Sequence, residues 1–401
     1  MTQPPSGAVA AAARESYGRI VATLIRVTGD WEMAEDCAQE ALAAALEKWP
    51  ATGVPANPGG WLMTVARNRA IDMLRRITVE QRKLREIAAL TPAEVAPAEG
   101  KDDVEDDRLR LIFTCCHPAL ALEARVALTL RTVCGVPTAE IGQAFLTGES
   151  TMTRRLTRAK TKIAKAGIPY RVPSGPALHE RLPGVLAVVY LLFTQGYNAD
   201  GDAAFADEAI RLARLLRRLM PDQPEVAGLL ALCLFQHSRR DARKDTDGNL
   251  LTLDKQDRTR WDHAAIAEAR ALLPELRPGP YAIQAQIAAE HVTEETDWPA
   301  VARWYDLLFE LQPSPVVQLN RAVAHGFASG PEAGLAILSA VRRDGVLDRY
   351  APAAAAEAEL TARMGDRVKA ELLFREAAGL TNSPAERRAL LDRADQMLEE
   401  T

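Results

Sequence analysis

Two stretches of the chain carry residue types that can recognise nucleic acid. Ser150 to Lys165 holds six basic residues and no acidic ones, and Thr64 to Arg85 holds seven basic and two acidic residues. Arginine and lysine bind phosphates, arginine also pairs with guanine, and asparagine reads base edges through its amide. The sequence therefore predicts two DNA-binding helices, although a net charge of −5 taken alone argues against a nucleic-acid partner.

The net charge is unevenly distributed along the chain, which resolves that conflict. Residues 1–170 hold 22 basic and 20 acidic residues, whereas residues 171–401 hold 27 and 34. The whole acidic excess therefore lies in the C-terminal part. The average charge hides the two cationic segments before residue 166.

Residues that could carry catalysis or bind a metal form no recognisable constellation. The sequence has no phosphate-binding glycine loop, nucleophile elbow or nucleotide fingerprint. Cys115, Cys116, His117 and Cys134 suggest a metal site, but adjacent cysteines chelate awkwardly, so we expect buried structural thiols. We expect no enzymatic activity, no metal and no cofactor.

The elements that must position these residues are helices. Alanine, leucine, arginine and glutamate dominate, apolar residues recur at helical spacing and no strand hairpin is evident, which predicts an all-α chain. Its 401 residues, 48% of them hydrophobic, suggest two or three domains. The apolar runs are shorter than a membrane helix requires, and the five irregularly spaced cysteines favour a reducing cytoplasm.

The first basic helix is expected to follow an acidic helix and a shaped loop. The acidic helix begins near Asp30, and prolines and glycines in residues 50–60 exclude a single continuous helix. In the helix from Trp61 to Arg76, apolar spacing places Leu62, Val65, Ala66, Arg69 and Met73 on one side. The residues free to face outward are Arg67, Asn68, Asp72, Arg75 and Arg76.

The order of these motifs resembles region 2 of extracytoplasmic-function (ECF) RNA polymerase sigma factors. The resemblance rests on the Ala-Glu-Asp-x-x-Gln-Glu-Ala helix, the Pro/Gly loop and the Trp-Leu-x-x-Val-Ala-Arg-Asn-Arg-Ala-Ile-Asp helix. It implies binding of the polymerase β′ clamp helices by Asp36, Gln39 and Glu40. It also implies recognition of the promoter −10 element, with a flipped base captured by loop 51–60 and Asn68. The residues implied for the −10 element are Asn57, Gly60, Trp61, Arg67, Asn68, Asp72, Arg75 and Arg76.

The second basic segment has the pattern of a helix-turn-helix. Residues 138–145 predict a short helix, residues 146–149 a turn, and residues 150–165 a recognition helix with Met152, Leu156, Ala159 and Ile163 at core spacing. The segment resembles sigma region 4, which implies binding of the −35 element and the polymerase β flap. The residues implied for the −35 element are Ser150, Thr151, Thr153, Arg154, Arg155, Thr157, Arg158 and Lys160.

The C-terminal part is predicted to contain helical repeats. Asp297-Trp298-Pro299, Gly330-Pro331 and Gly365-Asp366 open three helical pairs at intervals of 33 and 35 residues, close to the ~34 of a tetratricopeptide repeat. The chain is similar to the subgroup of ECF sigma factors with a fused C-terminal helical extension. That resemblance implies regulation in cis, through contact between the extension and the sigma regions or through an unidentified protein partner.

These observations predict four segments. Residues 1–90 would form region 2, residues 91–107 an acidic solvated linker, residues 108–170 region 4, and residues 171–401 the regulatory extension. The predicted function is promoter recognition by core RNA polymerase, in the cytoplasm and without a membrane. Two alternatives remain: a helix-turn-helix regulator with a ligand- or protein-sensing helical domain, and a tetratricopeptide adaptor that binds proteins only.

Overall fold

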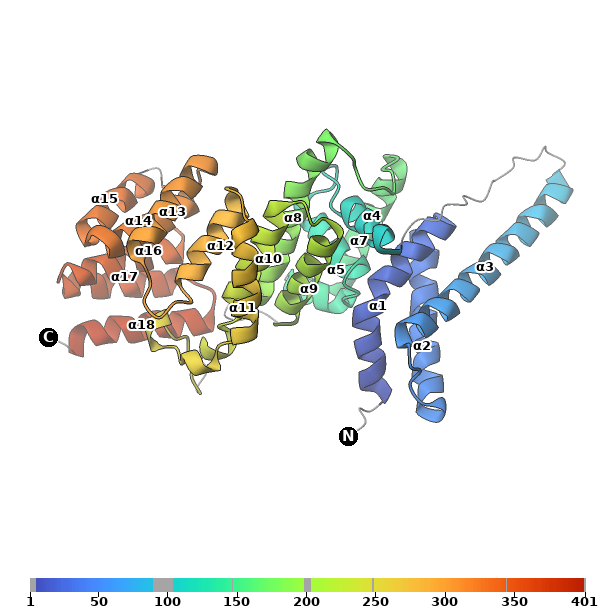
Figure 1. The fold of residues 1–401 in the computed structure, drawn as a ribbon, viewed down its shortest axis with the longest axis horizontal. Helices are drawn as coiled ribbons and strands as arrows, with labels where there is room; N and C mark the ends of the chain where they lie inside the picture. The colour runs from blue at the N-terminus through green and yellow to red at the C-terminus, as the bar shows by residue number, and fades with distance from the viewer. Residues whose placement is uncertain are drawn as a thin grey trace. The chain divides into compact units, whose positions relative to one another are not determined.

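Helices make up the regular structure of the chain in a computed structural model (Figure 1). The structure describes residues 5–88, 104–145, 147–197, 203–246, 249–343 and 345–399. Within these ranges, β pairing is limited to an isolated bridge between Lys244 and Leu250. The all-α prediction is confirmed. The chain divides into two compact units, Met1–Leu191 and Leu192–Thr401.

The first unit begins with a three-helix bundle whose second helix starts where the sequence predicts. The carboxylate of Asp30 accepts hydrogen bonds from the amides of Glu32 and Met33, which satisfies free donors in the first helical turn. Alanine, leucine and isoleucine side chains fill the bundle interior. The bundle helices are α1 (Pro5–Thr28), α2 (Trp31–Thr52) and α3 (Pro58–Ala88).

The loop between α2 and α3 is shorter than predicted. We expected residues 50–60 to be non-helical, but α2 continues through Pro50 to Thr52 and α3 begins at Pro58. Pro50 lies in the last turn of α2, where the Thr52 hydroxyl and the Gly53 amide still bond to carbonyls of the preceding turn. Pro58 occupies the first turn of α3, where a missing N–H costs nothing. The loop is therefore residues 53–57.

The helix-turn-helix prediction is confirmed in the rest of the first unit. The predicted core residues of the recognition helix, Met152, Leu156, Ala159 and Ile163, are all buried. The helices of this part are α4 (Val104–Cys115), α5 (Leu122–Thr132), α6 (Thr138–Ala144), α7 (Glu149–Lys165) and α8 (Pro176–Tyr197), in which the boundary between the two units falls.

The prediction of a solvated acidic linker that extends to residue 107 is wrong at Asp107. This residue lies in α4 and its side chain is 0% exposed. Its carboxylate pairs with Arg26 and with Arg110, each at 2.9 Å. Two arginines compensate the buried charge, and such compensation cannot be read from a run of acidic residues. Residues 91–103 lie outside the described residues.

Helix α8 is long and apolar enough to cross a membrane by length and composition alone. Core helices of folded domains meet the same criterion. Here the side chains of Val185, Val188 and Val189 are buried within the protein. Packing within the protein therefore explains the apolar composition of α8 as well as a membrane location would.

The second unit is a succession of helices, and the predicted pairs appear at the predicted places. Asp297, Gly330 and Asp366 each stand at the N-cap of the first helix of a pair. The pairs are α13 (Trp298–Leu311) with α14 (Pro315–Ser329), α15 (Pro331–Arg342) with α16 (Ala351–Arg363), and α17 (Arg367–Leu380) with α18 (Pro384–Glu399). They follow α9 (Ala203–Leu219), α10 (Pro224–His237), α11 (His263–Leu272) and α12 (Pro280–Glu290). Short 3-10 turns lie at Arg240–Ala242, Leu253–Lys255, Arg258–Arg260 and Leu273–Glu275.

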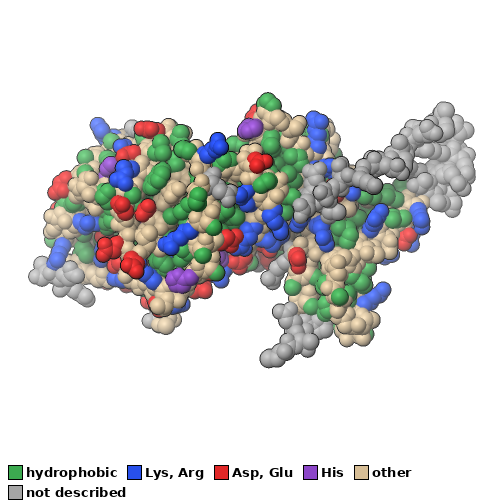
Figure 2. All heavy atoms as spheres, viewed as in Figure 1, with side chains coloured by type: hydrophobic (Ala, Val, Ile, Leu, Met, Phe, Trp, Pro, Cys, Tyr) green, Lys and Arg blue, Asp and Glu red, His purple; other side chains and the backbone are tan. Residues whose placement is uncertain are grey.

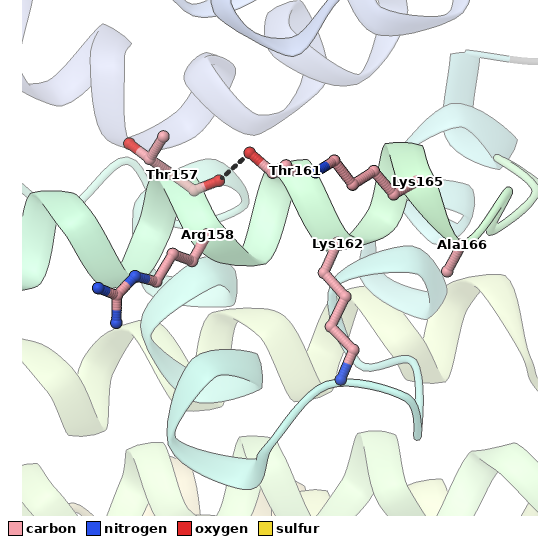
Figure 3. Close-up of a pocket in the computed structure, with 6 residues that line it drawn as sticks. All are labelled: Thr157, Arg158, Thr161, Lys162, Lys165 and Ala166. Carbon is pink, nitrogen blue, oxygen red and sulfur yellow. Dashed lines mark hydrogen bonds between the residues drawn. The ribbon is translucent and has the colours of Figure 1, made fainter.

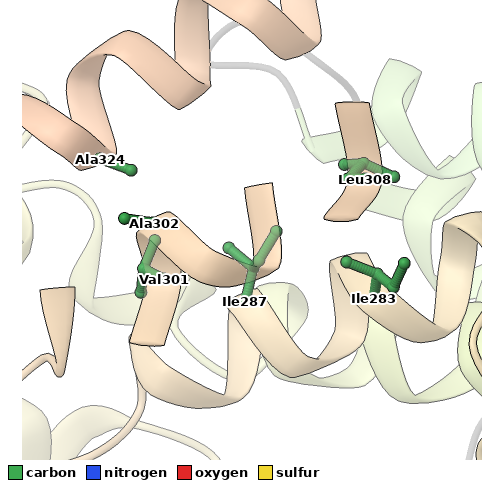
Figure 4. Close-up of a cluster of buried hydrophobic side chains, with 6 residues drawn as sticks. All are labelled: Ile283, Ile287, Val301, Ala302, Leu308 and Ala324. Atoms are coloured by element: carbon green, nitrogen blue, oxygen red, sulfur yellow. The ribbon is translucent and has the colours of Figure 1, made fainter. Parts of the chain in front are cut away.

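Apolar side chains of neighbouring helices pack together in core clusters of this unit. One core cluster joins Ile283 and Ile287 of α12 to Val301 and Leu308 of α13 (Figure 4). From α12 to α18 each helix packs against the next one along the chain, as in a helical-repeat array. Acidic and basic side chains are interspersed on the face of this unit that Figure 2 shows.

Candidate nucleic-acid interface

The recognition helix α7 exposes most of the residues expected to read the −35 element. Thr151 is half-buried, and the exposed residues are Ser150, Thr153, Arg154, Arg155, Thr157 and Arg158. The hydroxyls of Thr153 and Thr157 donate to carbonyls one turn earlier, at 2.9 and 3.0 Å. These bonds hold the threonine side chains against the helix, and Arg154 Nε likewise donates to the carbonyl of Ser150 at 3.3 Å.

Two shallow cavities flank this surface and share basic side chains. One, of about 480 Å³, is lined by residues from Thr157 to Ala166 (Figure 3). The other, of about 470 Å³, lies between α5 and α7. Arg158 and Lys162 line both cavities, and Figure 3 shows them extending from the same side of α7. Glu123 is the acidic residue that lines the second cavity, together with the basic residues Arg155, Arg158 and Lys162. A concave surface lined mainly by cationic groups suits a phosphate backbone.

Lys160 is placed differently from the other residues expected at the −35 element. Its side chain is only 16% exposed, and its Nζ lies 2.7 Å from Oε1 of Glu35 in α2. Arg131 of α5 approaches the other carboxylate oxygen of Glu35 at 3.7 Å. Glu35 is itself buried. No local pattern distinguishes Glu35 from its acidic neighbours, because its two partners lie about 100 and 125 residues further along the chain.

The outward face of α3 carries the other basic surface. The side chains of Arg67, Asn68, Asp72, Arg75 and Arg76 are exposed, as predicted, and basic side chains are visible along α3 in Figure 2. Asp72 and Arg75 lie 4.0 Å apart, so one acid partly offsets the local positive charge. The amide of Asn68 is free to meet a base edge.

The prediction that Arg69 lies on the buried side of α3 is wrong. It is 52% exposed at its side chain and forms an ion pair with Glu40 of α2. The apolar side of α3 consists instead of Leu62, Ala66 and Ala70. Helical spacing alone cannot separate an arginine at the edge of an apolar face from a core residue, because a long side chain extends from the edge to solvent.

The loop before α3 is held by three contacts. The side-chain oxygen of Asn57 accepts a hydrogen bond from the Gly60 amide at 2.9 Å, which caps α3. Trp61 packs edge-on against Trp49, with ring centroids 5.6 Å apart. Gly59 approaches Ser16 of α1 so closely that a Cβ at residue 59 would overlap the Ser16 hydroxyl.

Sequence reasoning missed the buried Trp49, which is 1% exposed. It lies in the last turn of α2, and Trp61 lies in the first turn of α3. A pair of tryptophans that flank a short Pro/Gly loop was the available signal. The pair fixes the directions in which the chain enters and leaves the loop.

The residues expected to bind polymerase lie along α2. Asp36, Gln39 and Glu40 are all exposed. The amide of Gln39 lies 3.5 Å from the hydroxyl of Tyr17 in α1. Gln39 also lines a cavity of about 460 Å³ whose opposite wall comes from α5, α6 and the turns beside them.

The cysteines are buried, as expected. The thiols of Cys115 and Cys116 lie 3.2 and 3.6 Å from the hydroxyls of Thr132 and Thr129. Burial raises the pKa of Cys116 to about 11, so this thiol stays protonated and is a poor metal ligand. In the described part of the chain, no three His, Cys, Asp or Glu residues are placed to hold a metal ion.

Comparisons with known families match three segments of the chain. Residues 13–79 match Sigma-70 region 2, residues 110–163 match Sigma-70 region 4, and residues 181–276 match a family of unknown function, DUF6596. The first segment covers most of the bundle α1–α3, and the second covers the helix-turn-helix up to residue 163. The chain thus carries both sigma modules in the order that the motifs predict.

Individual relatives agree with the family matches. The ECF RNA polymerase sigma factor SigL of Mycobacterium tuberculosis is 32% identical over 160 residues, which cover 38% of this chain and 88% of SigL. The probable ECF sigma factor SigI of the same organism is 29% identical over 174 residues, 43% of this chain and 59% of SigI.

Two comparisons extend beyond the sigma modules. An uncharacterized protein of Rhizobium meliloti (strain 1021) is 45% identical over 332 residues, 79% of this chain and 78% of the relative. Among solved structures, yeast Tom70 covers 99% of this chain and 86% of its own, with a TM-score of 0.35 and 13% identity.

Proposed function

The chain belongs to the ECF RNA polymerase sigma factors, and from this membership we propose how its two basic surfaces and its C-terminal unit contribute to promoter recognition. As a sigma factor it acts in transcription initiation, with core RNA polymerase and promoter DNA as partners. It would act in the cytoplasm without a membrane, cofactor, metal or catalytic site of its own.

Helix α7 would bind the −35 element in the major groove. The support is the run of exposed threonines and arginines near the start of α7, beside two cavities lined by Arg158 and Lys162. The N-terminal residues of a recognition helix are those that reach base edges. Residues 108–170 would form region 4 and would also contact the polymerase β flap.

Helix α3 and the loop 53–57 would bind the melted −10 element. The tryptophan pair and the Asn57 cap hold the loop next to the exposed face that carries Asn68. A rigid loop is required for this task, because capture of a flipped base loses affinity if the pocket must first be ordered. Asp36, Gln39 and Glu40 on α2 would bind the β′ clamp helices, within a region 2 that spans residues 1–90.

Run-off transcription with core polymerase tests these assignments. Promoter-specific RNA that requires both the polymerase and this protein supports sigma function, and binding to a palindrome without polymerase favours a repressor instead. Asn68→Ala should reduce open-complex formation and leave core binding unchanged. Asp36→Ala combined with Gln39→Ala should reduce core binding. An equal loss of both activities in both variants contradicts the division of roles.

The C-terminal part would regulate the sigma regions in cis. The observation that carries this proposal is that the chain after α7 is built into the first unit. The hydroxyl of Tyr170 donates to the carbonyls of Ala22 at 2.9 Å and Asp107 at 3.2 Å. Arg181 of α8 donates to the carbonyl of Phe113 at 2.7 Å. Movement of α8 would therefore be transmitted directly to region 4 and, through Tyr170 at the end of region 4, to α1 of region 2.

A chain truncated after Leu191 tests this regulation. It keeps the first compact unit and removes the second, and circular dichroism shows whether the remaining helices stay folded. Higher promoter-specific transcription per bound polymerase indicates inhibition by the extension, and lower transcription indicates assistance. Unchanged transcription by the folded truncated chain contradicts regulation in cis.

A further inference from the structure

The connection between α10 and α11, residues 238–262, is long and irregular. In its described part, residues 238–246 and 249–262, regular structure is limited to short 3-10 turns and the bridge between Lys244 and Leu250. Connections longer than about 12–15 residues are uncommon within a compact domain and usually carry a function. This connection belongs to the second unit, whereas both DNA-reading helices lie in the first, so its role is a separate one.

Two arginines of this connection converge on Tyr197 at the end of α8. The guanidinium of Arg243 lies over the Tyr197 ring, 3.9 Å from its centroid, and donates to the Tyr197 carbonyl. Arg239 donates from Nη2 to the Tyr197 hydroxyl at 3.4 Å. Phe193 stacks on the same ring, with centroids 5.4 Å apart. These contacts hold both guanidinium groups at one place on the second unit.

The charges of these two arginines are compensated differently from that of their neighbour Arg240. Arg240 pairs with Asp207 at 3.2 Å, and His237 lies 3.0 Å from the same carboxylate. Within the residues that the structure describes, neither Arg239 nor Arg243 pairs with a carboxylate. Both side chains are half-buried. A half-buried cation without a counter-ion costs free energy, which a bound anion would offset.

Two buried nitrogen atoms in this cluster lack a hydrogen-bond partner. They are Nε of Arg239 and Nδ1 of His291, which caps the C-terminal end of α12. Burial, together with the positive charge of Arg239, lowers the pKa of His291 to about 4, so the imidazole is neutral at pH 7. The influence of Arg239 on this pKa requires the two side chains to lie close together. Buried unpaired polar atoms are rare, and they mark places where water or an ion completes the structure.

Two further arginines hold the turn that follows His291. Arg258 donates to the carbonyl of Thr293 at 2.6 Å, and Arg270 donates to the carbonyl of Val292 at 3.3 Å. In the described part of the chain, neither of them pairs with a carboxylate. Four guanidinium groups without acidic partners thus lie around this turn and Tyr197, and their summed potential attracts anions.

Acidic residues flank the same turn without pairing with these arginines. Glu294 and Glu295 are exposed. Burial and the negative charge of Asp297 raise the pKa of Glu290, and Arg303 is the cation that lowers it. The charge of Glu290 is therefore balanced by Arg303, outside the cluster.

We propose that Arg239, Arg243 and His291 form a binding site for a phosphate group, either as the free ion or as part of a small phosphorylated molecule. The guanidinium groups pair with phosphate oxygens, and the imidazole donates from Nδ1. A dianion with several acceptor oxygens matches this set of donors better than a single carboxylate does. The cationic groups are half-buried and gathered around one turn, whereas a duplex backbone requires a row of exposed cations. The inference does not depend on the sigma function of the first unit.

Thermal unfolding of the full-length chain tests the site. Inorganic phosphate, pyrophosphate and AMP are each titrated at constant ionic strength, which is balanced with chloride. Each ligand that binds should raise the melting temperature of the second unit in a saturable manner, by about 3–6 °C at ten times its Kd. A lower Kd for pyrophosphate or AMP than for inorganic phosphate identifies a phosphorylated molecule as the ligand, and the reverse order identifies the free ion.

Matched variants separate this site from general stabilisation, because phosphate also stabilises folded proteins through exclusion from their surface. Arg239→Gln and, separately, Arg243→Gln should weaken binding at least about tenfold, which is the loss of one charge-assisted hydrogen bond. Arg260→Gln, at an exposed position of the same connection, should leave the titration unchanged. Equal melting shifts in all three variants, or no saturable shift with any of the ligands, overturn the site.

NMR of the wild-type protein supplies a readout that does not depend on the folding of variants. The imidazole signals of His291, assigned by their loss in His291→Asn, should move with the same Kd as the melting shift. The signals of the exposed His263 should stay in place. An unchanged His291 signal at saturating phosphate overturns the proposal even if the melting temperature rises.

Discussion

The contact between Gly59 and Ser16 predicts that the effect of Gly59→Ala on stability changes sign when Ser16 is also replaced by alanine. In Gly59→Ala, the new Cβ overlaps the buried Ser16 hydroxyl. Overpacking of this kind costs about 1–3 kcal/mol, against a gain of about 0.5–1 kcal/mol from replacing a helical glycine. We therefore expect net destabilisation of about 1–2 kcal/mol.

The same substitution should stabilise a chain that already carries Ser16→Ala. Without the hydroxyl, the nearest fixed atom is Cβ of residue 16 at 3.4 Å, which is ordinary van der Waals contact. Arg19 Nη2, at 3.1 Å, is the end of a flexible side chain and can move. The gain of about 0.5–1 kcal/mol from helix propensity then remains, and the two sites couple by about 2 kcal/mol.

Hydrogen exchange of the amides in α1 and α3 measures this local free energy without contributions from the second unit. Gly59→Ala should lower protection in both helices, and Ser16→Ala with Gly59→Ala should raise it above Ser16→Ala alone. Additive effects of the two substitutions would refute the argument that a steric contact between α1 and α3 positions the loop. Because α3 follows the loop directly, Gly59→Ala should also weaken open-complex formation, as followed by permanganate footprinting.

Three other predictions follow from single groups. Asp107→Asn should destabilise the first unit by about 3–5 kcal/mol because it leaves two arginines without their buried partner, with Arg26→Met as the milder control in urea denaturation. Burial, with Arg239 nearby, lowers the pKa of His291 from 6.5 to about 4. The unfolded chain then binds a proton that the folded chain excludes, so stability falls as pH drops from 6.5 toward 4, by up to about 3 kcal/mol. In His291→Asn, the melting temperature should depend less on pH between 6.5 and 5 than in the wild-type protein. An unchanged pH dependence of the melting temperature contradicts the lowered pKa of His291. Arg158→Gln should reduce the salt dependence of promoter binding by the holoenzyme by about one counterion; an unchanged slope would show that this arginine does not contact phosphate.

Local patterns in the sequence were sufficient for the helices and for much of the exposed surface. Met152, Leu156, Ala159 and Ile163 recur at the period of a helix, so their common burial followed from spacing alone. Asp297, Gly330 and Asp366 marked helix starts because capping depends on residues one to three positions away. The exposed faces of α3 and α7 could also be predicted, because they lie opposite the apolar faces of these helices.

Tertiary structure alone decided which charged residues are buried and what they bind. Glu35 and Asp36 are adjacent acids in one helix, yet the first is buried against Lys160 and the second is exposed. Asp107 ended an apparently solvated acidic run and is fully buried against Arg26. The free energy of a buried charge depends on partners brought together by packing of helices distant in sequence, and no local period encodes that distance. The sequence by itself therefore determined the two sigma modules, whereas only the packing of α1 and α2 against α5 and α7 revealed how the modules hold one another.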